Sequence, residues 1–109
     1  MDEKTYRARI LEAFGRIEKG FEKIDPDLAE CENAQGALTI TLRNRSKVIV
    51  SPQPSVRQIW LAVAAEGKAY HFNFDGGSGR WLDDRGTGHE LFAQISEAVG
   101  AELHQTIAI

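Results

Sequence analysis

A chain of 109 residues can form one hydrophobic core but is too short for two, so we expect a single domain over residues 1–109. Its net charge of −3 and the lack of a basic stripe argue against nucleic-acid binding, and no apolar run approaches the roughly 20 residues of a membrane-spanning helix. The lone Cys31 cannot form an intrachain disulfide, and the N-terminus lacks a signal-peptide pattern, so we expect a cytoplasmic protein.

The first predicted element is an amphipathic helix that precedes Pro26. Pro26 is expected to end this helix, because it disfavours helical geometry at Asp25. Gly15 and Gly20 each cost the helix about 1 kcal/mol relative to alanine and can mark a close approach to another element. The apolar residues of the helix recur at steps of four and three, which places them on one face: Tyr6, Ile10, Phe14, Ile17, Phe21 and Ile24.

The middle of the chain predicts an antiparallel meander, since short strand-like segments are joined by short turns. Residues 37–43 show the strand pattern most cleanly, because apolar and polar side chains alternate along them. The glycine-rich residues 76–79 lack the lysine and the following helix of a phosphate-binding loop, so they predict a hairpin turn. The expected strands are residues 28–33, 37–43, 47–50, 58–63, 70–74 and 80–82.

A second helix is predicted near the C-terminus. Thr87 and Glu90 have the spacing of a capping box, residues 91–99 supply an apolar face, and Gly100 is the expected terminator. The apolar residues of the segment 101–109 should dock against the body of the protein. A sheet covered on one face by both helices buries both apolar faces, so we predict an α+β fold: a two-layer αβ sandwich with two terminal helices on an antiparallel sheet of five to six strands.

Acidic residues concentrate near the end of the first helix and in the strand that follows. On the helix, Glu18, Glu22 and Asp25 fall at positions i, i+4 and i+7 and share one line, while Glu30 and Glu32 project to one face of the strand. Carboxylate oxygens suit hard cations, but no fixed coordination motif is present, so binding should be weak and multi-site. The alternative is a solvated acidic face without a ligand. The candidate metal-binding residues are Glu18, Glu22, Asp25, Asp27, Glu30 and Glu32.

A tryptophan is predicted on the uncovered face of the sheet. If Ile59, Leu61 and Val63 face the helices, then Gln58 and Trp60 face outward. A tryptophan among polar residues on an open face is typical of an interface anchor. The alternative is that a loop or the C-terminal tail covers it.

The remaining reactive residues form no catalytic constellation, so we expect no enzyme and no organic cofactor. His71, His89 and His104 lack the mutual spacing of a metal site or a proton relay. Cys31 is predicted to face inward, and the carboxylates beside it should raise its pKa and leave the thiol inert. Trp81 is predicted to pack in the core or at its edge.

Three strand segments carry a recognisable pattern: residues 36–40, 44–50 and 58–62. Tyr70–Phe72, Arg80–Arg85 and the terminal helix continue this pattern in order. The order, and above all the Gln58–Leu61 run, resembles the frataxins, particularly their bacterial branch, over most of the chain.

This resemblance implies a protein that binds iron (Fe²⁺ or Fe³⁺) weakly on an acidic ridge and modulates iron–sulfur cluster assembly. The ridge comprises the six candidate metal-binding residues, and Gln58 and Trp60 are the implied contacts of the sheet. The implied partners are the cysteine desulfurase and the iron–sulfur scaffold protein, and we expect a monomer. A metal-independent acidic interaction module and an oligomeric, ferroxidase-like iron store are the alternatives.

The chain departs from the bacterial frataxin pattern on both implied surfaces. Lys19, Lys23 and Leu28 stand where acidic residues are usual, so the predicted ridge is thinner than the family pattern. Ser51 and Pro52 replace the usual asparagine–basic pair before the tryptophan strand, which changes the surface expected to meet the scaffold protein.

Overall fold

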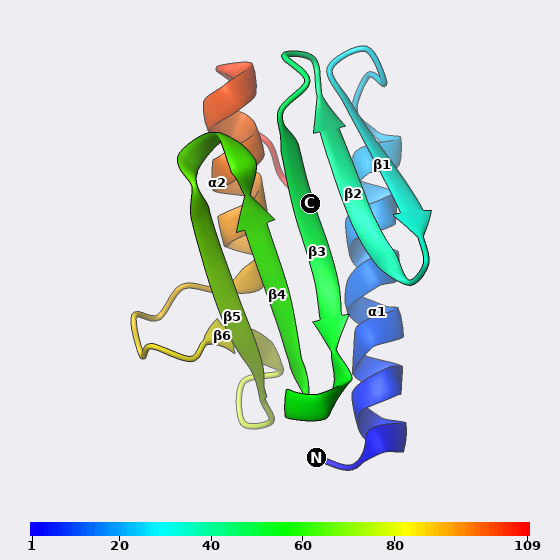
Figure 1. Cartoon of the computed structure of the whole chain (residues 1–109), viewed down its shortest axis with the longest axis vertical. Helices are drawn as coiled ribbons and strands as arrows, with labels where there is room; N and C mark the ends of the chain where they lie inside the picture. Colours follow the sequence, from blue (N-terminus) through cyan, green and yellow to red (C-terminus); the bar gives the residue numbers. More distant parts are fainter.

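The computed structural model describes residues 1–109 and contains two helices and one six-stranded antiparallel sheet. Figure 1 shows both helices behind the sheet, on the same face, which confirms the predicted two-layer αβ sandwich. The elements in chain order are α1 (Glu3–Glu22), β1 (Ala29–Ala34), β2 (Ala37–Leu42), β3 (Lys47–Gln53), β4 (Gln58–Val63), β5 (Lys68–Asp75), β6 (Arg80–Asp83) and α2 (Leu91–Leu103), with 3-10 turns at Pro54–Val56 and Ala64–Glu66.

Local hydrogen bonds set both ends of α1. Asp2 caps the N-terminus, where its carboxylate accepts a hydrogen bond from the Thr5 N–H at 2.7 Å. The helix ends at Glu22, before the predicted boundary at Asp25. The Asp25 carboxylate accepts a hydrogen bond from the Asp27 N–H at 2.9 Å, so this segment forms a side-chain-stabilised turn in place of another helical turn.

The strands lie in sequence order across the sheet, each paired antiparallel with its neighbour in the chain. Trp60 of β4 lies opposite Ser51 of β3 and His71 of β5. β3 extends beyond its predicted end at Val50, and the other strands agree with their predicted ranges to within two residues at each end. Pro52 is accommodated because β2 pairs with β3 only as far as Val50, so this part of β3 has one neighbour, as an edge strand does.

The hydrophobic core lies between the helices and one face of the sheet. Trp81 belongs to it and is 2% exposed, as predicted. The Tyr6 hydroxyl donates a hydrogen bond to the Gln58 carbonyl at 2.6 Å and accepts one from the Gln53 N–H at 3.0 Å, which ties the start of α1 to β3 and β4. Neither helix combines the length and the apolar character that crossing a bilayer requires.

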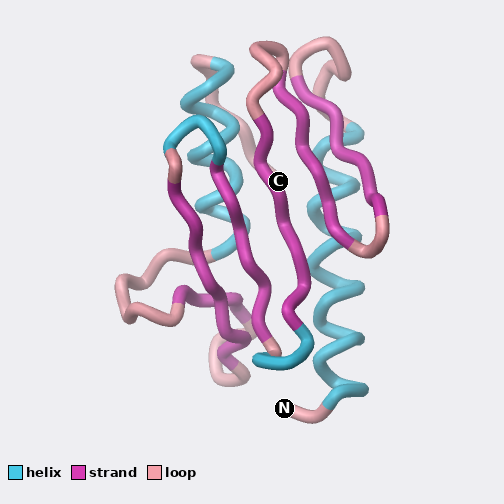
Figure 2. The backbone as a smooth tube through the Cα atoms, viewed as in Figure 1, coloured by secondary structure: helices cyan, strands magenta, loops and turns pink.

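The C-terminal residues dock against the body of the protein, as predicted, and the structure shows that they return to α1. In Figure 2 the tail leaves the end of α2 and runs behind the sheet. Ile107 and Ile109 are partly buried against the core. A Cβ atom at Gly20 would lie 2.7 Å from the Ile109 side chain, so this close approach explains one of the two glycines inside α1.

The predicted N-terminal cap of α2 is wrong. Glu90 is the capping residue, and its carboxylate accepts hydrogen bonds from the N–H groups of Phe92 at 2.9 Å and Ala93 at 3.0 Å. Thr87 donates its hydroxyl to the Asp83 carboxylate instead, which keeps it in the preceding loop. The capping-box spacing therefore identified the start of the helix but assigned the cap to Thr87, whereas Glu90 caps it.

The predicted end of α2 at Gly100 is also wrong. The helix continues to Leu103 and is capped by His104, which adopts a left-handed conformation with φ of 56°. A Cβ atom at Gly100 would lie 2.7 Å from the Gln105 carbonyl oxygen. Gly100 is thus required because the tail folds back over the helix and not because the helix stops there.

Candidate functional site

A groove between α1 and the edge strand β1 carries most of the predicted metal-binding carboxylates. Glu18 and Glu22 come from α1, Glu30 and Glu32 come from β1, and all four line this groove of about 240 Å³, which we call the acidic groove. The four-residue helical step and the two-residue strand step align each pair along its own element. The tertiary packing of β1 beside α1 then brings the two pairs together.

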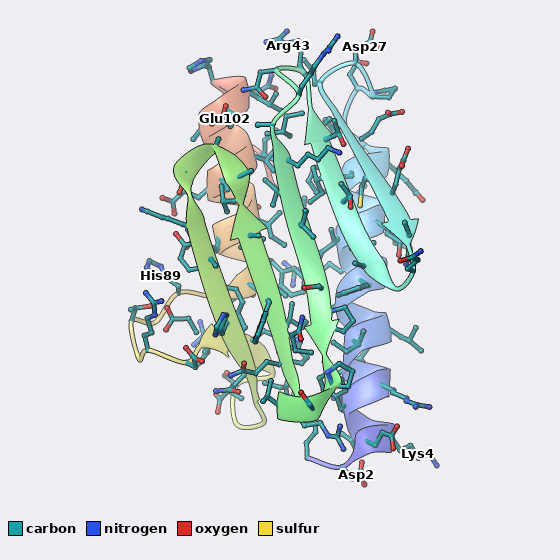
Figure 3. The ribbon with its side chains drawn as sticks, in the orientation of Figure 1. Asp2, Lys4, Asp27, Arg43, His89 and Glu102 are labelled. Atoms are coloured by element: carbon teal, nitrogen blue, oxygen red, sulfur yellow. The ribbon has the colours of Figure 1, made fainter.

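Asp25 and Asp27 do not line the acidic groove. They lie in the turn after α1, where the Asp25 carboxylate is occupied by the Asp27 N–H. Figure 3 shows Asp27 at the same end of the sheet as Arg43, a cation that opposes metal binding there. The structure thus gathers four of the six predicted carboxylates and leaves two apart.

The groove carboxylates are electrostatically uncompensated. None of the four accepts a hydrogen bond or forms an ion pair, although the protein contains such pairs elsewhere, for example Arg7 with Glu3 at 2.6 Å. Two like charges about 6 Å apart repel by about 0.7 kcal/mol in a water-like medium. The groove is therefore a source of negative potential that favours a cation or a basic surface.

The carboxylates do not form a closed metal-binding cluster. No three His, Cys, Asp or Glu side chains in the chain converge closely enough to hold a single metal. Hard cations such as iron accept carboxylate oxygen, but a closed coordination sphere needs several such ligands at one point. The donor chemistry fits iron, and the spacing fits ions held loosely along the groove.

Cys31 forms part of the groove wall. Its side chain is half-buried and packs against the core, in agreement with the predicted inward direction. Burial raises the pKa of the Cys31 thiol to about 11, with further contributions from the carboxylates of Glu18 and Glu32. The predicted increase in the pKa of Cys31 is confirmed, but burial is its main cause. Of the two contributing carboxylates, Glu32 neighbours Cys31 in the strand and Glu18 comes from α1. The thiol stays protonated at neutral pH and is a poor nucleophile and metal ligand.

The open face of the sheet carries a connected aromatic and polar surface around Trp60. The Trp60 and His71 rings stack with centroids 4.3 Å apart and an interplanar angle of 14°. The Trp60 Nε1–H donates to Gln58 Oε1 at 2.8 Å, and Gln58 Nε2 donates to Asn73 Oδ1 at 3.2 Å and to Asp84 Oδ2 at 3.1 Å. The outward direction predicted for Gln58 and Trp60 is confirmed.

Sequence reasoning missed how His71 and Asp84 complete this surface. His71 Nδ1 lies 3.7 Å from Asp84 Oδ2, so the imidazole that stacks on Trp60 also lies close to this carboxylate. The position of His71 opposite Trp60 depends on the register between β4 and β5, which alternation within a single strand does not specify. Asp84 follows β6, and a loop position gives no periodicity from which its direction could be read.

The sequence of this chain is similar to frataxin-like proteins along nearly all of its length. A family model for the frataxin-like domain matches residues 1–105. A protein of Paraburkholderia xenovorans named iron–sulfur cluster assembly protein CyaY is 39% identical, covering 89% of this chain and 87% of the relative. A protein of the same name from Aeromonas hydrophila is 37% identical, covering 98% of this chain and 97% of the relative.

Two solved structures share the fold. Frataxin from Psychromonas ingrahamii superposes with a TM-score of 0.86 at 23% identity, covering 99% of this chain and 97% of that one. Trimeric frataxin from the yeast Saccharomyces cerevisiae, complexed with ferrous iron, has a TM-score of 0.63 at 22% identity, covering 96% of this chain and 88% of that one. These likenesses establish the arrangement of two helices on an antiparallel sheet.

Proposed function

This chain belongs to the frataxin family, and we propose that it modulates the cysteine desulfurase of iron–sulfur cluster assembly in response to iron bound on its acidic groove. A role in iron–sulfur cluster assembly follows from the name that its bacterial relatives carry. The proposed response to iron rests on one observation: four carboxylates without hydrogen bonds or ion pairs lie along one groove. In this role the protein is a regulator and iron carrier, not a catalyst.

Iron is the cargo or effector in this proposal. Carboxylate oxygens bind Fe²⁺ and Fe³⁺, and the lack of a converging ligand trio predicts weak, exchangeable binding at several points. Weak binding suits a protein that senses or passes on iron, because a tightly closed site would retain it. A yeast frataxin solved as a complex with ferrous iron supports iron as the cation.

The same groove is proposed to contact the desulfurase. Its uncompensated negative charge favours a basic partner surface and would speed the encounter. Iron and the partner then interact with the same carboxylates of Glu18, Glu22, Glu30 and Glu32, so bound iron changes the affinity for the partner. The open face with Gln58 and Trp60 is left for the scaffold protein, and this division lets one small domain meet both.

A metal-independent acidic interaction module is the second candidate, and the absence of a chelating trio favours it. In that case the groove binds the basic partner surface through charge alone. Binding would weaken with rising salt and would not respond to iron.

The test is a pull-down of the purified desulfurase with the full chain, with and without Fe²⁺. The informative variants are E18Q/E22Q in the groove and D25N/D27N in the adjacent turn, because both remove two charges while keeping similar side-chain shapes. We expect E18Q/E22Q to weaken capture and to abolish its response to iron, and D25N/D27N to leave both nearly unchanged. Capture that falls equally in both variants contradicts the groove assignment, and capture indifferent to iron supports the second candidate.

Paramagnetic broadening by Fe²⁺ supplies an independent readout. In nuclear magnetic resonance spectra of the full chain, amide signals of Glu18, Glu22, Glu30 and Glu32 should broaden together. Broadening confined to the turn at Asp25–Asp27, or to the sheet face, would contradict iron binding in the groove.

A further inference from the structure

A second groove lies on the other side of α1, between this helix and the chain end at Ala108 and Ile109. It has a volume of about 490 Å³, larger than that of the acidic groove, and we call it the basic groove because Arg16, Lys19 and Lys23 line it. The helix thus separates two grooves of opposite charge. Lys19 and Lys23 therefore belong to the basic groove and do not line the acidic groove.

Two of the three cations of the basic groove are available for a ligand. The side chains of Lys19 and Lys23 form no ion pair or hydrogen bond within the chain. Arg16 is held in place, since it donates to the Ile109 main-chain oxygen at 3.1 Å and its guanidinium lies 3.9 Å from the Phe92 ring centroid. The one acidic residue of the lining, Glu12, is bound to a neighbouring arginine at 2.7 Å.

The groove also has an apolar part that the fold leaves uncovered. Leu11 lines it and is 75% exposed. Leu11, Gly15 and Lys19 follow at four-residue steps and share one line of the helix.

Gly15 has no structural explanation within the chain. A Cβ atom at this position would meet nothing within 4 Å, whereas one at Gly20 would collide with Ile109 at 2.7 Å. Glycine disfavours a helix, so Gly15 destabilises α1 without allowing any contact inside the protein. A bare stretch of helix backbone is what a second molecule needs for close approach.

We propose that the basic groove docks an acidic protein segment that carries an apolar side chain. The apolar side chain packs beside Leu11 over Gly15, and carboxylates of the segment meet Lys19 and Lys23. A long polyanion such as a nucleic acid fits less well. Glu18 and Glu22 directly precede Lys19 and Lys23 in α1, so an extended negative backbone that runs past the basic groove meets repelling carboxylates. The acidic segment is a second partner, independent of the proposed contact between the acidic groove and the desulfurase.

The test titrates the full chain at low salt with a labelled synthetic peptide that repeats Glu-Glu-Leu-Leu over about ten residues, roughly three helical turns. Amide shifts should be confined to residues 11–23 of α1 and to Ala108 and Ile109. The variant K19E/K23E should lose at least about tenfold in affinity, and K4E/K47E, with the same charge change elsewhere, less than about twofold. A peptide with Lys in place of Glu should move to the acidic groove.

Gly15→Ala distinguishes docking from simple charge attraction. It should raise the melting temperature by roughly 4–8 °C, because alanine favours the helix and its methyl group has room, yet it should weaken the acidic peptide severalfold. Equal peptide affinity in Gly15→Ala, or shifts spread over all exposed lysines, would overturn the proposal. Binding to phosphatidylglycerol vesicles that K19E/K23E abolishes, without peptide binding, would assign the groove to lipid and would also overturn it.

Discussion

The acidic groove and the open sheet face differ in how their polar groups are satisfied. The groove presents four carboxylates without hydrogen bonds or ion pairs, while the sheet face presents Trp60 stacked on His71 and hydrogen-bonded to Gln58. Unpaired like charges act at a distance and adapt to any cation or basic surface. A connected aromatic surface holds one shape and recognises a partner by contact, so salt should weaken the first surface far more than the second.

The largest expected effect tests the contact surface. Trp60→Ala should weaken binding of the scaffold protein by about 2–4 kcal/mol, because a central aromatic anchor is lost, and this loss should change little with salt. Calorimetric titration at low and high salt measures both quantities. Ile49→Ala, on the same sheet and 37% exposed, is the matched control and should change the affinity much less. An unchanged affinity in Trp60→Ala would remove the sheet face from the partner surface.

The next prediction tests the electrostatic repulsion between the carboxylates of the acidic groove. E18Q/E22Q should raise the free energy of unfolding by about 1 kcal/mol at low salt, because it relieves repulsion and removes negative charge near the C-terminus of α1. Urea unfolding at low salt and at high salt measures this gain, which should disappear at high salt. A gain that is independent of salt would mean that the carboxylates do not repel one another.

A smaller effect concerns the thiol in the groove wall. The pKa of Cys31 is about 11 in the folded protein and near 9.0 without burial, so between these pH values the unfolded chain ionises while the folded protein stays neutral. Stability should therefore be complete below pH 9 and fall as pH rises toward 11, by less than about 1 kcal/mol because the side chain is only half-buried. Cys31→Ala should lack this part of the slope. Identical slopes in the two proteins would show that the thiol is not desolvated.

The smallest effect tests how far the sheet face depends on a single ring. His71→Phe keeps an aromatic ring against Trp60 and removes the contact with Asp84, so scaffold binding should change by less than about 0.5 kcal/mol. The same calorimetric titration measures it. A loss as large as that of Trp60→Ala would make the imidazole as important a contact as the indole.

The sequence by itself determined the fold class, the family and the direction of Trp60. Apolar residues at helical and strand periods specify which faces are buried, and this information is local, so both helices and all six strands were predicted. The outward position of Gln58 and Trp60 needed only the alternation of side chains along a strand. The helix ends were less predictable, because Asp25 and Glu90 act through hydrogen bonds to particular neighbours that periodicity does not reveal.

Only the tertiary structure decided which side chains meet across elements. It placed Glu30 beside Glu18 but left Asp27 outside the acidic groove, and it showed that Gly20 makes room for Ile109 while Gly15 makes room for nothing in the chain. These outcomes depend on the distance between segments that are far apart in sequence. The packing of an edge strand and a C-terminal tail against α1 sets those distances, and no periodicity within one segment contains them.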